Sequence, residues 1–150
     1  MTKNRVLILL DGSKFRERIL PYVRRFLRPE DTHLILTRVA DLPQSIYYVE
    51  GPIFVSVDDE QSEATLSTQL REELLATKVL LEEAGYTVSR EVRFGSAPLE
   101  IERFIKESQI DLVAMTTYAR TGLSKLLYGS IAEHLIRTVK IPIMVLHPAD

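Results

Sequence analysis

The residues best suited to chemistry lie around Gly129 and Ser130, a short distance after an apolar run that ends at Met115. Ser130 and Glu133 have the S-x-x-E spacing of a capping box, in which both side chains satisfy backbone N–H groups of a first helical turn. A helix is therefore predicted from about Ile131, and the positive end of its dipole favours a bound anion. Gly129 would let the backbone approach that anion closely. The alternative is that these residues only begin a helix.

Such a site needs a strand before it and a helix after it, and the chain alternates the two kinds of element throughout. Apolar runs predict strands over residues 5–10, 33–39, 87–93, 110–115 and 141–146. Apolar residues at helical spacing predict helices over residues 14–27, 61–84 and 96–108, and from residue 131 onward. We expect Ser13 to cap the first helix, Pro21 to kink or shorten it, and Gly85 to end the second.

This alternation predicts an α/β fold: an open, doubly wound, five-stranded parallel sheet in the order 3-2-1-4-5, with helices on both faces. In such sheets ligands bind beyond the carboxyl ends of the strands, where the strand order reverses. That point lies between the first and fourth strands, so the turn Asp11-Gly12-Ser13 and the loop after Met115 are expected to form one site. Asp11 is either a ligand contact or a turn former that bonds its own backbone.

Length and composition limit the functions that the chain can have. We predict a single domain over residues 1–150, because no Pro/Gly/Ser linker divides the chain. The net charge of −2 without a basic block argues against a nucleic-acid or anionic-membrane surface. The absence of cysteine excludes thiol catalysis, and the three histidines have no metal-ligand spacing. We see neither a membrane span nor a signal segment, so we expect a cytoplasmic protein.

Two further segments are candidates for contact with another chain. The connection over residues 42–60 is unusually apolar for a loop, with Tyr47, Tyr48 and Phe54 among its residues. We expect it to fold over the sheet end or over another chain, as a lid or a dimer contact. The last strand, Ile141 to Leu146, offers an apolar sheet edge and is the expected homodimer interface.

The segment from Thr116 to Ser130 resembles the nucleotide loop of the universal stress protein family. The family pattern is G-x2-G-x9-G-[ST], and Thr116 and Ala119 stand here at its first two glycine positions. The first strand with Asp11-Gly12-Ser13 is similar to the family's first strand and turn, and Gly95-Ser96-Ala97-Pro98 to its turn into the third helix. The resemblance extends from end to end apart from residues 42–60. It implies a homodimer and, in many members, bound ATP or a related adenine nucleotide, with or without magnesium.

In family members that bind ATP, the matching positions imply distinct roles. Asp11, with Gly12 and Ser13 in the same turn, would lie near the adenine and ribose, and Val39 would line the base pocket. The residues expected under the nucleoside are Met115 and Thr116. The phosphates would be surrounded by backbone N–H groups and a serine hydroxyl from Ala119, Arg120, Gly129, Ser130 and Ile131.

One departure from the family pattern leaves two functions open. The methyl group of Ala119 disfavours the positive φ angles that glycine reaches easily, at a point where the backbone must approach phosphate. The chain is either a stress or signalling protein that holds ATP, or a dimeric family member without nucleotide that acts through an unidentified protein partner. No Walker lysine and no evident base are present, so we expect no enzyme, or at most slow ATP hydrolysis.

Overall fold

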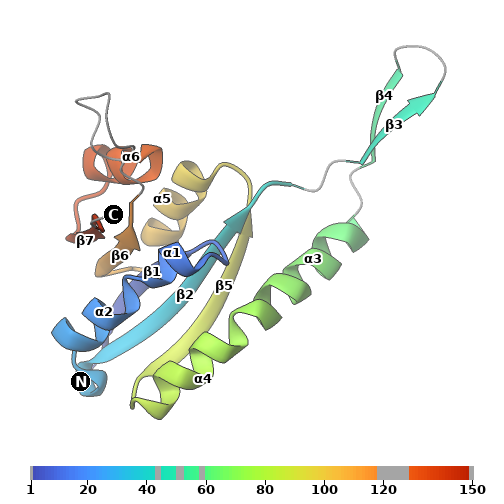
Figure 1. The fold of residues 1–150 in the computed structure, drawn as a ribbon. Helices are drawn as coiled ribbons and strands as arrows, with labels where there is room; N and C mark the ends of the chain where they lie inside the picture. Colours follow the sequence, from blue (N-terminus) through green and yellow to red (C-terminus); the bar gives the residue numbers. More distant parts are fainter. Residues whose placement is uncertain (1, 43–44, 50–52, 58–59, 118–128, 149–150) are drawn as a thin grey trace.

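Five parallel strands form the central sheet of the computed structural model, which describes residues 2–42, 45–49, 53–57, 60–117 and 129–148 (Figure 1). Their order across the sheet is β5-β2-β1-β6-β7. Numbered along the chain, this is the order 3-2-1-4-5, so the predicted α/β fold is confirmed. The bounds are Asn4–Leu10 for β1, Thr32–Ala40 for β2, Thr87–Phe94 for β5, Leu112–Thr116 for β6 and Ile143–Leu146 for β7.

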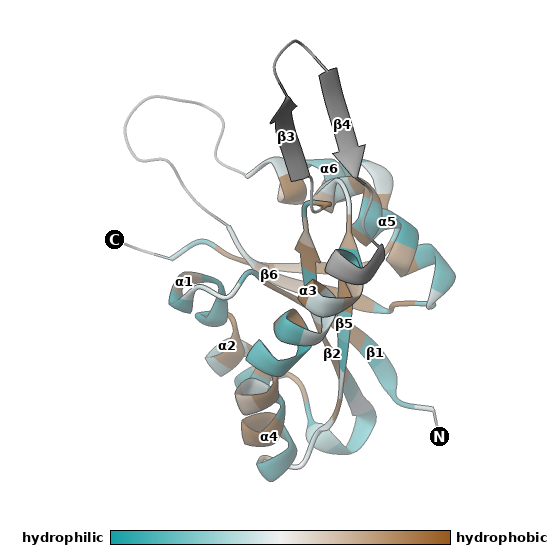
Figure 2. Ribbon diagram, turned by 90° about the vertical axis from the view of Figure 1, so that its right-hand side faces the viewer, coloured by the Kyte–Doolittle hydropathy of each residue, from teal (hydrophilic) through white to brown (hydrophobic). Residues whose placement is uncertain are grey.

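Helices cover both faces of the sheet (Figure 2). One face carries α1 Lys14–Glu17, α2 Leu20–Phe26, α3 Glu60–Glu73 and α4 Leu75–Glu83, and a 3-10 helix Pro29–Asp31 leads from α2 into β2. The other face carries α5 Ala97–Glu107 and α6 Ser130–Thr138. None of the helices in the described ranges is long and apolar enough to cross a membrane.

The central strand β1 is buried on both faces, and its side chains divide the core in two. Val6, Ile8 and Leu10 pack with residues of α2 and α4, whereas Leu7 and Leu9 pack with residues of α5 and α6. Successive side chains of a strand point to opposite faces, so a strand covered on both sides is apolar throughout. This two-sided burial places β1 in the middle of the sheet. The carboxyl end of β1 therefore lies midway along the side of the sheet on which all five parallel strands end.

Both long helices predicted from the sequence are divided in the structure. Pro21 lies in the first turn of α2, where a missing N–H costs little, and the break before it agrees with the predicted kink. The prediction of one continuous helix over residues 61–84 is wrong. The N–H of Leu74 donates to the carbonyl of Arg71, three residues back, and this tightened turn separates α3 from α4. Gly85 ends α4 with a φ of 99°, as predicted.

The connection over residues 42–60 contains a hairpin that the sequence analysis did not predict. Strands β3 Ser45–Val49 and β4 Ile53–Val57 pair antiparallel, with Tyr47 opposite Val55. Aromatic and β-branched residues dominate both strands, and such residues favour extended structure. The side chains of this segment lie outside the described part, so its role as a lid or a dimer contact stays a hypothesis.

Candidate functional site

The turn after β1 and the end of β6 meet at the carboxyl edge of the sheet, because β1 and β6 are neighbouring parallel strands. Two hydrogen bonds join them. The Thr116 hydroxyl donates to the backbone carbonyl of Arg16 at 3.1 Å, and the Arg16 guanidinium donates to the backbone carbonyl of Thr116. The end of β6 and the segment that follows β1 therefore meet as predicted, at the point where the strand order reverses, while residues 118–128 of the predicted loop lie outside the described residues.

Asp11 is the anchor of the turn that follows β1. Its carboxylate accepts the N–H of Ser13 at 2.9 Å, the hydroxyl of Ser13, and Nε of Arg16 at 3.4 Å. Partial burial acts to raise the pKa of Asp11, but the hydrogen bonds from Ser13 and the charge of Arg16 outweigh it, so the pKa lies below its ordinary value. Of the two roles predicted for Asp11, the structure displays that of the turn former. Ser13 also caps α1 as predicted, accepting the N–H of Arg16 at 3.2 Å.

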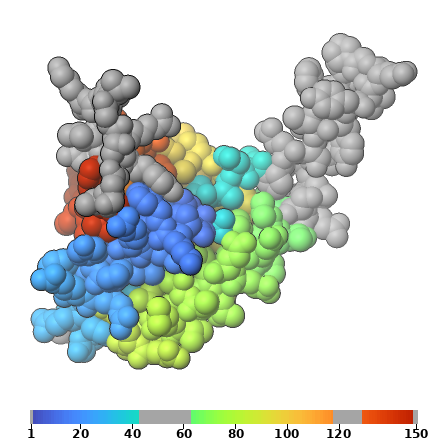
Figure 3. All heavy atoms as spheres, in the orientation of Figure 1, coloured from blue at the N-terminus to red at the C-terminus, as the bar shows by residue number. Residues whose placement is uncertain are grey.

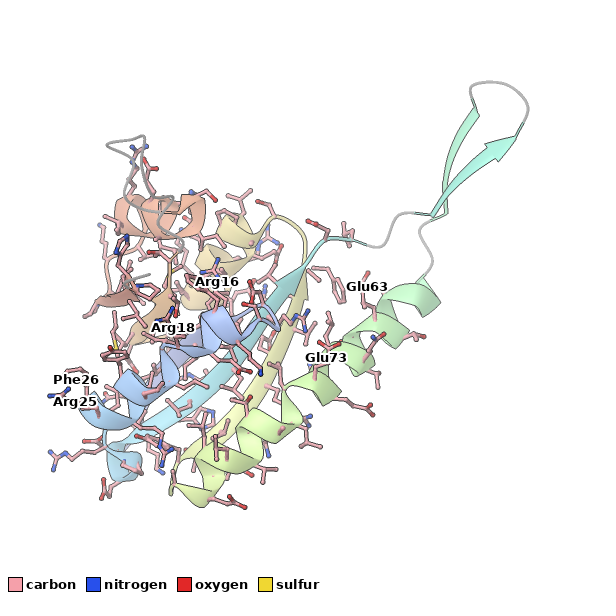
Figure 4. All side chains as sticks on the ribbon, viewed as in Figure 1. Arg16, Arg18, Arg25, Phe26, Glu63 and Glu73 are labelled. Atoms are coloured by element: carbon pink, nitrogen blue, oxygen red, sulfur yellow. The ribbon has the colours of Figure 1, made fainter. Side chains whose placement is uncertain are left out.

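Gly12 occupies a backbone conformation that favours glycine, with a φ of 85°. Arg38, at the end of β2, packs against it: a Cβ built on Gly12 would stand 3.1 Å from the guanidinium. Arg38 is held in turn by an ion pair with Glu73 at the end of α3. The Asp11-Gly12-Ser13 turn is thus flanked by two arginines, Arg16 and Arg38, which the sequence analysis did not single out. Figure 4 labels Arg16 and Glu73, which reach this region from α1 and from α3.

Val39 and Met115 lie on the opposite face of the sheet from Arg38. Both belong to the core that β1 shares with α5 and α6; Met115 is fully buried and Val39 is half-buried. The structure therefore brings these two predicted site residues to one face, and the arginine pair to the other. A ligand across the strand ends would contact apolar groups on one side and cationic groups on the other.

Thr117 follows β6 and carries a buried polar atom without a partner. Its side chain is 1% exposed, and its Oγ1 has no hydrogen-bond partner among the described residues. A buried polar atom left unsatisfied costs about 1–3 kcal/mol, so each case needs an explanation. A polar ligand at this edge would supply one. Thr117 could not be singled out from the sequence, because its position in the loop carries no signal for burial.

Helix α6 begins one residue earlier than predicted, and this shift removes the capping box. Gly129 is the N-cap and Ser130 the first helical residue, without a capping hydrogen bond from a side chain. Glu133 instead accepts Nη2 of Arg137 at 2.6 Å, so the predicted pairing of Ser130 with Glu133 is wrong. The S-x-x-E spacing forms a capping box only when Ser130 is the N-cap, and the spacing alone does not show which residue occupies that position. The first N–H groups of α6 consequently have no side-chain acceptor in the described part of the chain.

The space in front of Gly129 is open. A Cβ built on this residue would meet no described atom within 4 Å, and its φ of −60° is ordinary for any residue. Ser130 beside it is exposed, whereas Ile131 packs against the core between α5 and α6. Ala119 and Arg120, the remaining predicted phosphate contacts, lie outside the described residues.

The histidines are placed on different elements. His33 of β2 lies 3.0 Å from the Thr87 hydroxyl and 2.9 Å from that of Ser89, and His134 of α6 lies 2.9 Å from Glu102 of α5. Within the residues that the structure describes, no group of three or more His, Asp or Glu side chains could hold a metal ion.

The comparisons with known proteins identify the family. The model of the universal stress protein family matches residues 3–147. Universal stress protein MJ0531 of Methanocaldococcus jannaschii is 34% identical over 105 residues, which cover 67% of this chain and 62% of that protein. Universal stress protein MJ0577 of the same organism is 23% identical over 150 residues, covering 94% and 93% of the two chains. The chain belongs to the universal stress protein family.

Solved structures share the fold over nearly the whole chain. That of MJ0577 has a TM-score of 0.69 at 22% identity and covers 100% of this chain and 99% of its own. A universal stress protein in complex with cAMP has a TM-score of 0.64 at 16% identity, with 98% of both chains covered. An Arabidopsis thaliana family member with AMP bound has a TM-score of 0.58 at 14% identity, covering 95% and 90%. At these identities the likeness concerns the fold.

Proposed function

We propose that this chain is a stress or signalling protein that binds an adenine nucleotide, ATP or a related one, where β1 and β6 end. The nucleoside would lie between the Asp11-Gly12-Ser13 turn and Thr116, and the phosphates would lie before α6. Two structural neighbours in the same family support this assignment, because one is in complex with cAMP and another has AMP bound. The proposal takes residues 1–150 as one domain of the family.

The observation that carries the proposal is the start of α6. Its first N–H groups lack side-chain caps in the described part of the chain, and the space before Gly129 is open there. Free N–H groups and the positive end of a helix dipole favour an anion, with phosphate as the most frequent one. Phosphates would contact Gly129, Ser130 and Ile131 through backbone N–H groups, together with the predicted contacts Ala119 and Arg120. The Thr117 hydroxyl is a further candidate contact.

The β1 side of the site would position the nucleoside. A carboxylate offers about four lone-pair positions, and Ser13 and Arg16 occupy three of those on Asp11, so about one remains for a ribose hydroxyl. Half-buried Val39 would supply apolar surface for the base, whereas the side chain of Met115 stays buried in the core. Any magnesium would enter with the phosphates, as it does where substrate oxygens provide most of its ligands.

We expect the nucleotide to be held and not rapidly hydrolysed. Fast phosphoryl transfer needs a cation on the terminal phosphates and a group that orients the attacking water. No lysine of the described part lies at the start of α6, and Asp11 is already engaged by Ser13 and Arg16. Bound nucleotide would then act by changing contacts with a partner.

One observation favours the alternative, a dimeric family member that acts through a protein partner without nucleotide. The Arg16 guanidinium bridges Asp11 and the Thr116 carbonyl, so polar groups of both turns are satisfied within the chain. The edge strand β7, with its half-buried side chains, would provide the homodimer contact in either case. Light scattering that gives a monomer at micromolar concentration would contradict that contact.

Calorimetric titration with magnesium-ATP separates the two functions. We expect saturable binding of one nucleotide per chain, and loss of at least about tenfold in affinity in Gly129→Val. Because the φ of Gly129 is ordinary, valine fills the space without straining the backbone. Equal affinity in the variant would overturn the placement of the phosphates. If the natural chain does not bind the nucleotide and the Ala119→Gly variant does, the alternative function is established.

A further inference from the structure

Residues 14–28 concentrate positive charge that the composition as a whole does not show. They include six Lys or Arg and one acid, Glu17, so their net charge is +5. Because the whole chain carries −2, the remaining residues together carry −7. The net charge of −2, from which no nucleic-acid surface is expected, averages over this asymmetry. The cations are interleaved with apolar residues, so they form no long basic run in the sequence.

The backbone turns these cations toward solvent along one ridge of α1 and α2. Arg18 and Ile19, between the two helices, keep helical backbone angles, so the rotation of 100° per residue continues through them. Arg25 then projects opposite the buried Val23, and Arg18 lies on the same side two turns earlier, about 10 Å along the axis. In Figure 3 the two helices lie at the surface of the face toward the viewer, beside α3 and α4.

The cations of the ridge are available to an anion. Lys14, Arg18 and Arg25 are exposed, and none of them takes part in an ion pair with a described residue. Arg28 follows α2, with a side chain that is 83% exposed and a distance of 4.0 Å from Asp31, so that pair is weak. An anionic ligand would therefore not have to displace a strong internal partner.

Two aromatic side chains are exposed among these cations. Tyr22 is 41% exposed, and Phe26, one turn further along α2, is 62% exposed. The Arg25 guanidinium lies over the Phe26 ring, 5.5 Å from its centroid. Figure 4 shows Arg25 and Phe26 pointing away from the body of the protein. Aromatic rings and arginine guanidinium planes are the surfaces on which unpaired nucleic-acid bases stack.

We propose that the ridge of α1 and α2 binds single-stranded nucleic acid, with phosphates on its cations and bases stacked on Phe26 and Tyr22. The planar fork of an arginine side chain contacts two phosphate oxygens at once. The bases of a duplex are already stacked on one another, so exposed rings beside arginines fit an unpaired strand. This site uses none of the residues of the proposed nucleotide site and does not depend on it.

The neighbouring helix α4 favours a narrow polymer over a flat anionic surface. A groove separates α2 from α4; Glu17 lines it, and α4 exposes Glu82 and Glu83 beyond it. An anionic bilayer broad enough to meet α2 would also meet these carboxylates, whereas a single strand can follow α2 alone. An acidic peptide is narrow as well, but it carries no bases to stack on Phe26. The contribution of the ring therefore distinguishes a nucleic acid from other anions.

Fluorescence anisotropy with labelled oligo-U and oligo-dT, each about ten nucleotides long, tests the proposal. We expect saturable binding at low salt and, for three phosphate contacts, a slope of about −2 in log K against log salt concentration. Binding of either oligonucleotide supports the proposal, and a preference for oligo-U identifies RNA through its 2′-hydroxyl groups.

The arginines of the ridge should account for the salt dependence. Arg18→Gln/Arg25→Gln should weaken binding at least about tenfold at low salt and reduce the slope by about 1.4, which corresponds to two lost phosphate contacts. Arg103→Gln/Arg137→Gln is the matched control, because it removes two exposed arginines from α5 and α6 on the other face of the sheet. Equal losses in the two double variants would overturn the proposal.

The Phe26 ring tests whether bases are stacked. Phe26→Leu keeps an apolar side chain and removes the ring, so affinity should fall about fivefold or more while the salt slope stays the same. Circular dichroism on each variant confirms folding. Gly129→Val, which alters only the proposed nucleotide site, should bind oligo-U as the natural chain does, so the two proposals fail separately.

Four results would overturn the assignment of the ridge to single-stranded nucleic acid. The first is the absence of saturable binding of either oligonucleotide at low salt. The second is an unchanged affinity in Phe26→Leu, and the third is displacement of oligo-U by polyglutamate at equal charge concentration, which would indicate an acidic protein partner. The fourth is binding to vesicles of anionic phospholipid by a chain that binds neither oligonucleotide.

Discussion

The two halves of the candidate site are built in opposite ways. On the β1 side, the Asp11 carboxylate and the N–H and hydroxyl of Ser13 are bonded within the protein, and Arg16 and Arg38 hold the turn from both sides. On the β6 side, the Thr117 hydroxyl and the first N–H groups of α6 have no side-chain partner among the described residues. A bonded turn keeps its shape without a ligand, whereas unpaired groups gain most when one arrives. We infer that the first half positions the nucleotide and the second supplies most of its affinity.

The two glycines of the site give the largest expected contrast. Gly12→Ala should destabilise the protein by about 1–2 kcal/mol, because its φ of 85° disfavours a side chain and Arg38 must move aside. Gly129→Ala should leave stability within about 0.5 kcal/mol, because its φ is ordinary, and should weaken nucleotide binding instead. Urea unfolding and calorimetry on both variants measure the two effects. Equal loss of stability in the two variants would remove the contrast between the halves.

Removal of the Arg16 side chain should have the next largest effect. Arg16→Met keeps most of the apolar stem and loses the hydrogen bonds to Thr116 and Asp11, at a cost of about 1–2 kcal/mol. Arg16→Lys is the matched control, because it keeps the charge but cannot reach both partners with a planar fork. If Arg16→Met unfolds at the same urea concentration as the natural chain, the bridge between the turns does not contribute to stability.

Arg16→Met also tests how the stability of the protein depends on pH through Asp11. Burial acts to raise the pKa of Asp11, but Ser13 and Arg16 lower it below the ordinary value of 3.8. Because the folded pKa is the lower one, the stability that Asp11 contributes is fully present above the unfolded pKa and is lost as pH falls through the folded value. In Arg16→Met, the pKa of Asp11 should rise toward the unfolded value, so the loss of stability should be smaller and should be complete at a higher pH. Carbon-detected NMR of the Asp11 carboxyl follows the change, and an unaltered titration would contradict it.

How far the sequence alone could lead differs between the fold and the site. The strand order could be predicted because β1 is buried on both faces, and its apolar run from Val6 to Leu10 is a direct sign of that position. The Ser13 cap and the break at Pro21 are local, so they could be predicted too. The start of α6 could not, since the spacing of Ser130 and Glu133 does not reveal that Gly129 takes the N-cap position.

The residues missed by sequence reasoning make contacts that depend on tertiary structure. Arg16 and Thr116 are separated by 100 positions, and the Arg38 guanidinium meets Gly12 only because β1 and β2 pair in this register. Thr116 and Thr117 are adjacent and of the same type, yet only the hydroxyl of Thr116 finds a partner among the described residues. In physical terms, local spacing determines turns and caps, whereas the polar neighbours of a site are determined by strand register and helix packing.

The adjacent threonines provide a smaller and finer test of the comparison. Thr116→Val should destabilise the protein by about 1 kcal/mol, because its hydroxyl donates to the Arg16 carbonyl. Thr117→Val keeps the shape and removes a hydroxyl without a described partner, so stability should be unchanged or slightly higher. Nucleotide affinity should fall about threefold to tenfold in Thr117→Val if the hydroxyl contacts the ligand. Thermal unfolding with and without ATP measures both, and greater destabilisation by Thr117→Val would contradict the assignment.

The smallest effect is expected from the ion pair that holds Arg38. Glu73→Gln keeps the size of the side chain and removes the charge that Arg38 contacts, while Arg38 remains against Gly12. Because the Glu73 side chain is 45% exposed, the loss of stability should be at most about 0.5 kcal/mol. Nucleotide affinity should rise slightly at low salt, since the charge of Arg38 is then no longer offset by Glu73 and attracts the anionic nucleotide more strongly, and this gain should vanish at high salt. Calorimetric titration at two salt concentrations follows it. Lys78→Gln, which alters the pair with Glu82 away from the site, is the matched control; an equal change there would show that Arg38 has no specific role.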